Sequence, residues 1–263
     1  MEGDHGIGRS SNGISTSAAA AAAVRVSSIS NGGGGDDDRQ LVQFVLSSSS
    51  ALKIQKGDIT KWSVDGASDA IVNAANERML GGGGVDGAIH RAAGPELRAA
   101  CVDVPEVRPG VRCPTGEARI TPAFRLPVSH VVHTVGPIYD VDRHPEDLLR
   151  SAYRSCLTLA KENNILYIAF PAISCGVYGY PYAEAATVAI STVKEFAEDF
   201  KEVLSITLRS YGLFGWGIKL SKPGLRVMPL MLLVMNNGAI KESPSKLYSE
   251  TDGLVDDPAR LNS

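Results

Sequence analysis

One stretch of the sequence, residues 73–94, combines residue types that could bind and process an anionic ligand. Asn73 and Asn76 are followed by four glycines, residues 81–84, and then by Asp86. Glycines let a ligand approach the backbone closely, and the free N–H groups at the start of a helix favour anions. A carboxylate at such a place would repel phosphate. Asp86 therefore indicates chemistry on the ligand, or a contact with its sugar hydroxyl groups.

The spacing around these glycines excludes two common nucleotide-binding motifs. No Lys-Ser or Lys-Thr pair closes the glycine run as in a P-loop, and the glycine spacing of dinucleotide-binding folds is also missing. Paired asparagines beside an acid can bind sugar hydroxyl groups. Asparagines are also ordinary turn-forming residues, so both roles stay open for Asn73 and Asn76.

A second glycine loop follows another predicted strand and precedes another predicted helix. Two such loops after buried strands favour a shared anion site at the carboxyl ends of the strands. The aromatic residue of this loop could pack on a sugar ring or simply cover the loop. The loop consists of Ser174, Cys175, Gly176, Val177 and Tyr178.

The remaining acids and histidines have ordinary structural explanations. Asp58 follows a predicted strand in a Gly-Asp turn, where aspartates usually accept hydrogen bonds from backbone N–H groups. His90 lies one helical turn after Asp86, where it either contacts that carboxylate or stays on the helix surface. His130 and His133 are three residues apart on a predicted strand, so they should face opposite sides. The sequence thus predicts no metal site.

The elements that must position these residues alternate between strands and helices. Residues 149–160 repeat apolar side chains with helical spacing, whereas residues 166–173 form a short apolar run typical of a buried strand. Alternation of this kind predicts a layered α/β domain. We expect strands over residues 41–46, 52–55, 70–72, 117–123, 129–135, 166–173 and 203–208, and helices over residues 88–93, 95–101, 146–163 and 184–199.

Composition changes at both ends of the chain and so predicts the domain limits. Residues 1–40 are rich in Ser, Ala and Gly, and such a segment buries too little apolar surface to offset its ordering entropy. We expect a disordered tail there, although a Ser- and Ala-rich start also resembles an organelle transit peptide. The domain should cover residues 41–208. Residues 209–263 are turn-rich and are expected to form an irregular tail.

Overall composition excludes several functional classes. The formal net charge of −3 argues against a protein that binds the phosphate backbone of nucleic acid. No apolar run is long enough to span a bilayer. The 4 cysteines form no C-x-x-C pair, which is typical of a reducing compartment.

Six motifs in order resemble the macrodomain family, in particular its MacroD-type ADP-ribosyl hydrolase branch, which is also called the Appr-1''-p processing domain. The resemblance extends from about residue 41 to residue 203. The motifs are GDIT (57–60), IVNAAN (71–76), GGGGVDGAIHRAAGP (81–95), TGEARIT (115–121), VVHTVGPIY (131–139) and FPAISCGVYGYP (170–181).

The resemblance implies a three-layer α/β/α sandwich with a mixed central sheet and an ADP-ribose site at the strand ends. It implies that Asp58 accepts a hydrogen bond from the adenine amino group, with the Ile59 backbone beside it. Asn73 and Asn76 would contact the distal ribose, and Asp86, assisted by Asn76, would act in catalysis. Two loops would hold the diphosphate, namely Gly82, Gly83, Gly84 and Val85 in the first, and Ser174, Cys175, Gly176, Val177 and Tyr178 in the second.

The activity implied by the resemblance is hydrolysis of ADP-ribose esters without a metal or cofactor. The substrates would be O-acetyl-ADP-ribose and proteins mono-ADP-ribosylated on Asp or Glu. A monomer in the cytoplasm or nucleus is expected, with organelle import less favoured. The alternatives are a module that binds ADP-ribose without hydrolysing it, and an inactive splice product, since residues 209–263 depart from the family. Cys175 also departs, because the family usually has threonine there.

Overall fold

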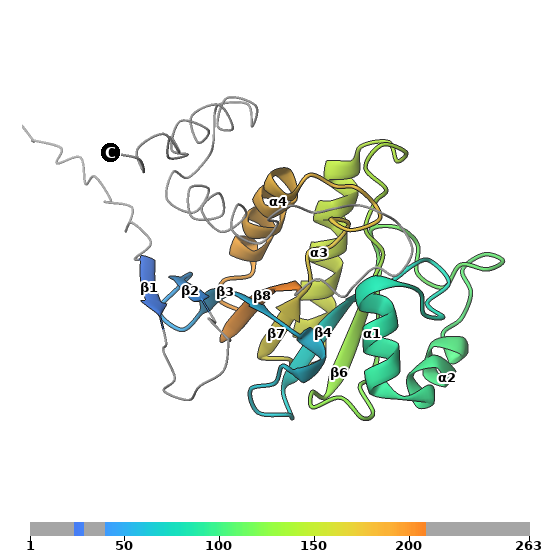
Figure 1. The fold of residues 1–263 in the computed structure, drawn as a ribbon, viewed down its shortest axis with the longest axis horizontal. Helices are drawn as coiled ribbons and strands as arrows, with labels where there is room; N and C mark the ends of the chain where they lie inside the picture. Colours follow the sequence, from blue (N-terminus) through green and yellow to red (C-terminus); the bar gives the residue numbers. More distant parts are fainter. Residues whose placement is uncertain (1–23, 29–39, 209–263) are drawn as a thin grey trace, which may run out of the picture.

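The computed structural model describes residues 24–28 and 40–208 of the chain. Their strands form one eight-stranded sheet with the order β1-β2-β3-β8-β7-β4-β6-β5 (Figure 1). The sheet is mixed, as expected from the sequence. The strands are β1 (Val24–Ser28), β2 (Gln40–Val45), β3 (Ala51–Gly57), β4 (Asp69–Ala74), β5 (Ala118–Pro122), β6 (His130–Thr134), β7 (Tyr167–Phe170) and β8 (Glu202–Leu208).

Five neighbouring strands of this sheet run in the same direction. β3 pairs in parallel with β8, β8 with β7, β7 with β4, and β4 with β6. The antiparallel strands lie outside this group, with β1 and β2 at one end of the sheet and β5 at the other. The carboxyl ends of the five parallel strands therefore share one edge of the sheet, where ligands of open α/β folds bind.

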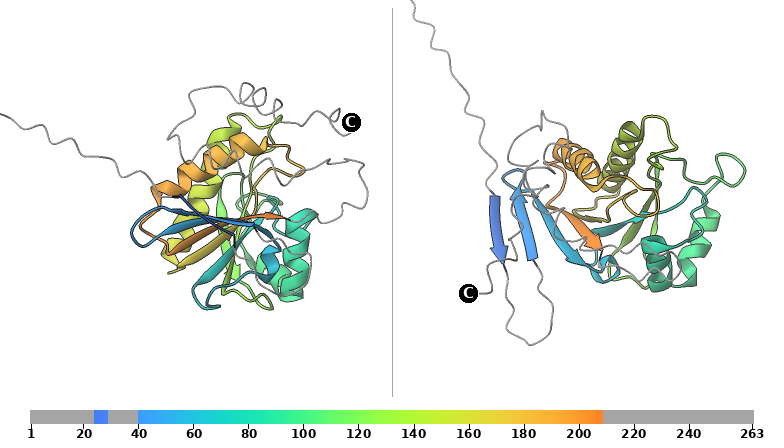
Figure 2. Two further views of the ribbon diagram at one scale, coloured as in Figure 1. Left: turned by 60° about the vertical axis from the view of Figure 1, so that its left-hand side comes forward. Right: turned by 45° about the horizontal axis from the view of Figure 1, so that its top comes forward.

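Helices cover both faces of the sheet. Figures 1 and 2 show α3 and α4 on one face, with α1 and α2 on the other. Gly94 ends α1 with a φ of 87°, and Pro95 then begins α2, where a missing N–H group costs nothing. The helices are α1 (Gly84–Ala93), α2 (Pro95–Asp103), α3 (Pro145–Glu162) and α4 (Tyr182–Glu195), and a short 3-10 helix, η1, covers Ile59–Lys61.

The side chains of β4 show how the two faces are separated. Ala70 and Val72 pack in the core cluster that contains α3 and α4, whereas Ile71 packs in the cluster that contains α1 and α2. Alternate residues of a strand point to opposite faces, so a fully apolar strand fills both layers. The predicted α/β/α sandwich is confirmed.

The amino-terminal limit of the fold differs from the sequence-based expectation. β1 lies inside the segment predicted to be disordered, residues 1–40, and it pairs antiparallel with β2. The prediction is wrong for this strand because backbone pairing with the open edge of β2 supplies contacts that composition does not reveal. The other parts of that segment, and the predicted irregular tail over residues 209–263, lie outside the described residues. Among the described residues, every helix is too short or too polar to be a candidate membrane span.

Candidate functional site

The residues singled out in the sequence meet at the carboxyl edge of the parallel strands. Asp58 follows β3, Asn73 lies near the end of β4, and the Ser174–Tyr178 loop follows β7. The first glycine loop leads from β4 into α1, which starts within the loop at Gly84. The two glycine loops therefore leave neighbouring strands, β4 and β7, at the same edge of the sheet.

Asp86 is a buried carboxylate in the first turn of α1, with 3% of its surface exposed. Its Oδ1 accepts a hydrogen bond of 2.8 Å from Asn73 Nδ2. Its Oδ2 is buried and has no hydrogen-bond partner among the described residues. The helix N-cap is Gly83, so Asp86 does not serve as the side-chain cap of α1.

Burial determines the electrostatics of this acid. Desolvation raises the pKa of Asp86, while the hydrogen bond from Asn73 and the charge of His90 lower it to a smaller extent. The result is a carboxylate with a raised pKa, which accepts a proton more readily than an exposed aspartate does.

His90 contacts Asp86 from the next turn of the same helix. Its Nε2 lies 3.4 Å from Asp86 Oδ1, and its side chain is 11% exposed. Burial lowers the pKa of His90, the Asp86 carboxylate raises it, and Arg98 lowers it again. Of the two roles that the sequence left open, the structure supports contact with Asp86 rather than a position on the helix surface.

A buried chain of polar groups continues from Asp86 into the sheet. Asn73 Nδ2 lies 3.1 Å from His133 Nδ1, and His133 Nε2 lies 3.0 Å from Thr121 Oγ1. Burial, followed by the charge of His90, lowers the pKa of His133 to about 3, so the ring is neutral. Sequence reasoning missed the part that His133 plays. The sequence did contain a signal for it: His133 lies two positions after Val131, which is buried, and therefore on the same face of the strand.

One group of potential metal ligands occurs beside this chain. Ligand atoms of His90, Cys101 and His133 lie within 4.8 Å of one another, although the sequence predicted no metal site. Both ring nitrogens of His133 already lie within hydrogen-bond distance of protein groups, and burial raises the pKa of the Cys101 thiol to about 11. An ion would have to displace these partners and deprotonate that thiol. The arrangement is a polar core cluster, with no ready set of ligands.

Asn76 organises the first glycine loop. Its Nδ2 donates to the carbonyl oxygen of Gly81 (3.1 Å), and its Oδ1 accepts from the N–H group of Arg78 (3.1 Å). A Cβ atom at Gly82 would lie 3.0 Å from Asp86 Oδ2 and 3.3 Å from Asn76 Nδ2. The absence of a side chain at Gly82 therefore leaves room between Asn76 and Asp86.

The second glycine loop is held in a strained turn beside the first. Ser174 has a φ of 64°, a conformation that is uncommon outside glycine, and its buried Oγ has no hydrogen-bond partner among the described residues. Tyr178 is half-buried, and its pKa is raised by desolvation, by Glu77 and by Asp86. Burial also raises the pKa of the Cys175 thiol to about 12, so this thiol is not activated as a nucleophile.

Asp58 has the structural role that turn chemistry predicts. Its Oδ1 accepts from the N–H group of Thr60 (3.0 Å) and from the Thr60 hydroxyl group (2.7 Å), which caps η1. Ile59 is fully buried against the layer that contains α1 and α2. These contacts fix the turn that presents Asp58 at the end of β3, and the following η1 packs against α1.

Comparison with known proteins gives consistent results. The Macro domain family model matches residues 72–189. An O-acetyl-ADP-ribose deacetylase from Salmonella gallinarum is 56% identical over 149 residues, which are 56% of this chain and 80% of that protein. The chain belongs to the macro domain family.

Solved structures of other macrodomains agree with this assignment. The Oceanobacillus iheyensis macrodomain with ADP has a TM-score of 0.62 and 36% identity, over 81% of this chain and 100% of that one. A mutant of the same macrodomain with ADPR has a TM-score of 0.58 and 43% identity, over 65% of this chain and 91% of that one. The resemblance inferred from the six motifs is confirmed.

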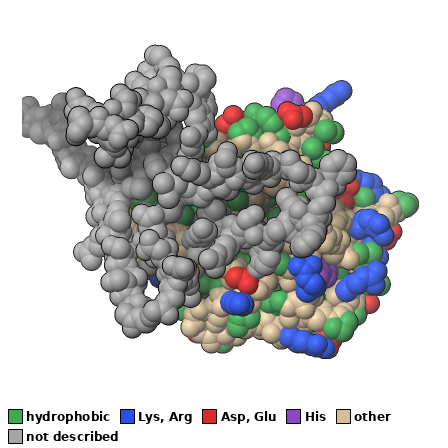
Figure 3. All heavy atoms as spheres, viewed as in Figure 1, with side chains coloured by type: hydrophobic (Ala, Val, Ile, Leu, Met, Phe, Trp, Pro, Cys, Tyr) green, Lys and Arg blue, Asp and Glu red, His purple; other side chains and the backbone are tan. Residues whose placement is uncertain are grey.

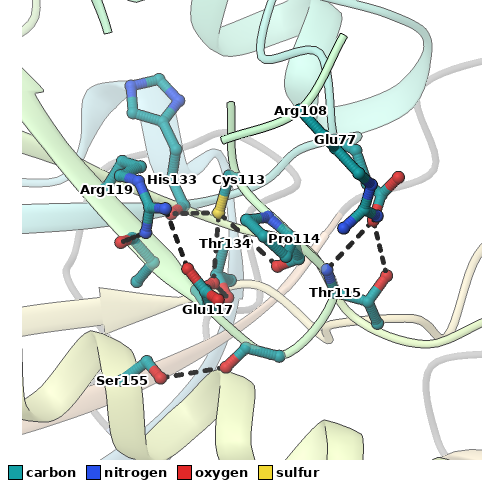
Figure 4. A network of polar contacts seen from close by, with 12 residues as sticks. Glu77, Arg108, Cys113, Pro114, Thr115, Glu117, Arg119, His133, Thr134 and Ser155 are labelled. Carbon is teal, nitrogen blue, oxygen red and sulfur yellow. Dashed lines mark hydrogen bonds and ion pairs between the residues drawn. The ribbon is translucent and has the colours of Figure 1, made fainter. Parts of the chain in front are cut away.

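A network of polar contacts holds the segment that leads from β4 to the first glycine loop of this macro domain. The Glu77 carboxylate accepts from Arg108 Nη2 (3.1 Å) and from the N–H group of Thr115 (3.3 Å). Figure 4 shows these contacts, and it shows the imidazole of His133 pointing away from them, while the His133 carbonyl oxygen accepts from Cys113 Sγ. The segment over residues 108–117 thus holds both Glu77, shortly before the first glycine loop, and the backbone of β6.

Basic side chains lie near α1 and α2 on the surface of the macro domain. Figure 3 shows Lys and Arg side chains gathered on the side where these helices lie, and Arg91 and Arg98 are exposed there. Arg91 lies in the last turn of α1 and Arg98 on α2, so these charges flank the helix pair and not the amino-terminal turn of α1.

Proposed function

We propose that this macro domain hydrolyses ADP-ribose esters, with O-acetyl-ADP-ribose and proteins mono-ADP-ribosylated on Asp or Glu as substrates. The observation that carries the proposal is Asp86 Oδ2, a buried carboxylate oxygen without a hydrogen-bond partner among the described residues. A buried acceptor without a partner is costly for the fold, which is typical of a functional site. The relative named O-acetyl-ADP-ribose deacetylase supports the proposed class of substrate.

In the proposed reaction, Asp86 Oδ2 accepts a hydrogen bond from a water molecule and directs it at the acyl carbon of the ester. The water oxygen bonds to that carbon, and the bond from the carbon to the ribose oxygen breaks. The ribose oxygen takes up a proton, and the acyl group leaves as a carboxylic acid. Because burial raises the pKa of Asp86, its carboxylate is also a stronger proton acceptor for this water than an exposed aspartate would be.

The binding groups proposed for ADP-ribose follow the order of the strands. Asp58 accepts from the adenine amino group, with the Ile59 backbone beside it. The loops over residues 82–85 and 174–178 hold the diphosphate with backbone N–H groups, and Asn73 and Asn76 hold the distal ribose. The amino-terminal turn of α1 supplies N–H groups without partners inside the helix, which favours the diphosphate.

The decisive experiment incubates the purified full-length chain with O-acetyl-ADP-ribose and, separately, with a mono-ADP-ribosylated acceptor protein. Release of acetate or of free ADP-ribose is expected from the parent and should be nearly abolished in Asp86→Ala. The variant should still bind ADP-ribose, because Asp86 acts mainly on the water in the transition state. ADP-ribose binding by the parent without any release would instead favour the non-catalytic binding module.

A further inference from the structure

The neutral imidazole of His133 is an unusual component of a sheet interior. His133 is fully buried on β6, yet both ring nitrogens lie within hydrogen-bond distance of polar side chains. Buried polar groups cost stability unless they are satisfied; the His133 ring has partners on both nitrogens, whereas Asn73 Oδ1 and Asp86 Oδ2 have none among the described residues. The position of this ring next to the site of the proposed reaction calls for a functional explanation.

The register of the sheet places the ring beside Asn73. Asn73 on β4 and His133 on β6 are direct partners across the parallel strands. Two residues earlier on each strand, Ile71 and Val131 pack in the layer that contains α1 and α2. The side chains at 73 and 133 point to this same layer because strand side chains alternate. The amide of Asn73 therefore lies between the imidazole of His133 and the carboxylate on α1.

The hydrogen atoms of this chain can be assigned from its partners. Asn73 Nδ2 carries two hydrogens, and it lies 2.8 Å from Asp86 Oδ1 and 3.1 Å from His133 Nδ1. With one hydrogen donated to each, Nδ1 acts as an acceptor and the proton of the neutral ring is on Nε2. Nε2–H then donates to Thr121 Oγ1 at 3.0 Å. All four residues are buried, so water does not compete for these contacts.

We infer that His133 is a positioning residue for ester hydrolysis: its Nδ1 holds the Asn73 amide in the orientation that donates to Asp86 Oδ1. A rotated amide would direct its oxygen at the carboxylate, and the acceptor at Nδ1 selects against that orientation. Oδ1 is thereby occupied, and Oδ2 remains as the oxygen that meets the water. The inference rests on the proposed function, although the hydrogen-bond order itself can be measured without turnover.

The pH dependence supplies one measurable consequence. The titratable and charged groups that act on Asp86 are His90 on α1, Cys101 on α2 and Tyr178 after β7, and Arg98 acts on it indirectly through His90. The Asn73 N–H group lowers the pKa of Asp86. Loss of the oriented amide should therefore raise this pKa and move the acid limb of the kcat profile to higher pH.

Two substitutions at one position separate positioning from packing. In His133→Asn the shorter amide can place an oxygen near the former Nδ1 and still accept from Asn73. In His133→Gln the longer amide reaches the former Nε2 position and keeps the contact with Thr121 instead. We expect His133→Gln to lower kcat on the order of tenfold to a hundredfold with little change in KM, and to shift the acid limb upward. His133→Asn should retain most of the parent kcat and the parent pH profile.

Three further measurements make the test decisive. Thr192→Val removes a buried hydroxyl group from α4, away from the site, and should lower stability without changing kcat. Nitrogen NMR of the parent should show the His133 proton on Nε2, and a proton on Nδ1 would overturn the inference even if both His133 variants fail to fold. A carbon NMR titration of Asp86 should show a higher pKa in His133→Gln than in the parent.

Other outcomes also separate the inference from the proposed function. Equal losses of kcat in both His133 variants, with unchanged pH profiles, would mean that His133 only fills space. An inactive parent would refute the proposed hydrolysis, while the tautomer and the Asp86 titration would still confirm or refute the hydrogen-bond order.

Discussion

Replacing Asp86 by asparagine should stabilise this macro domain while abolishing its proposed activity. The carboxylate is 3% exposed, its Oδ2 has no partner among the described residues, and burial raises its pKa. A neutral amide of the same shape keeps an oxygen to accept from Asn73 and removes the desolvated charge. His90 is half-buried and has a lowered pKa, so little ion-pair attraction is lost. We expect a gain on the order of 1 kcal/mol near neutral pH, because the cost of desolvating the charge is removed while an unpartnered amide nitrogen takes the place of Oδ2.

The gain should depend on pH in a direction fixed by the raised pKa. The folded protein holds the Asp86 proton more tightly than the unfolded chain, so the parent becomes more stable as pH falls through the folded pKa toward 3.8. Asp86→Asn lacks this titration. The variant should therefore exceed the parent in unfolding free energy by the largest amount above the folded pKa of Asp86, and this difference should disappear near pH 3.8. Urea unfolding at several pH values measures it.

Asp69→Asn is the matched control, because Asp69 is the other fully or nearly fully buried aspartate among the described residues. Its Oδ2 accepts backbone N–H groups of Val64 (2.6 Å), Asp65 (3.0 Å) and Gly66 (2.9 Å). An asparagine there loses part of this charge-assisted set and should destabilise the domain by about 1.5–3 kcal/mol. Melting temperatures should move in opposite directions, by about 2–4 °C for each kcal/mol. If the melting temperature of Asp86→Asn falls as much as that of Asp69→Asn, the idea that Asp86 is held at a cost to stability is refuted.

Three other substitutions test the assigned ligand contacts. Asn76→Ala should weaken binding of ADP-ribose more than binding of ADP, since only ADP-ribose carries the distal ribose, while the lost contact with the Gly81 carbonyl oxygen affects both ligands through the first glycine loop. Equal losses of affinity for the two ligands in calorimetry would show that Asn76 does not contact the distal ribose. Gly176→Glu should fold normally, because a Cβ at Gly176 meets nothing within 4 Å, yet its charge should weaken ADP-ribose binding sharply. Unchanged affinity in the folded variant would reject this loop as a diphosphate site. Gly82→Ala places a Cβ 3.0 Å from Asp86 Oδ2 and should lower kcat more than it raises the Kd for ADP-ribose; a normal kcat would show that the water lies elsewhere.

The sequence predicted the elements well where one physical signal dominated. The amphipathic period of residues 146–163 and the apolar run before Ser174 correspond to α3 and β7 within a few residues. The glycine run was harder to interpret, since α1 begins at Gly84 inside it, before the first alanine of the apolar pattern. β1 escaped notice because an edge strand depends on its neighbour's backbone, which no local pattern records.

The candidate site was predictable in its residue types but not in its connections. Asp86 and both loops stand out by their chemistry, and the carboxyl-edge rule brings them together. The contact between Asn73 and His133 depends on β4 and β6 being neighbours in a given register. Sixty residues separate them in the sequence, and their spacing alone favours no pairing. Strand order is a property of the whole fold, so this part of the site needed the structure.

Strand order also constrains the length of the ligand. Asp58 follows β3 and Asn73 lies on β4, and the order β3-β8-β7-β4 puts three inter-strand steps between them. At about 4.8 Å for each step, the two residues are about 14 Å apart along the sheet edge. The Ser174–Tyr178 loop follows β7, which lies between them. A ligand that contacts all three must be elongated, with an anionic middle. ADP-ribose meets this requirement, with adenine and distal ribose at opposite ends of a diphosphate, whereas a single ribose phosphate would leave one end of the edge without contacts.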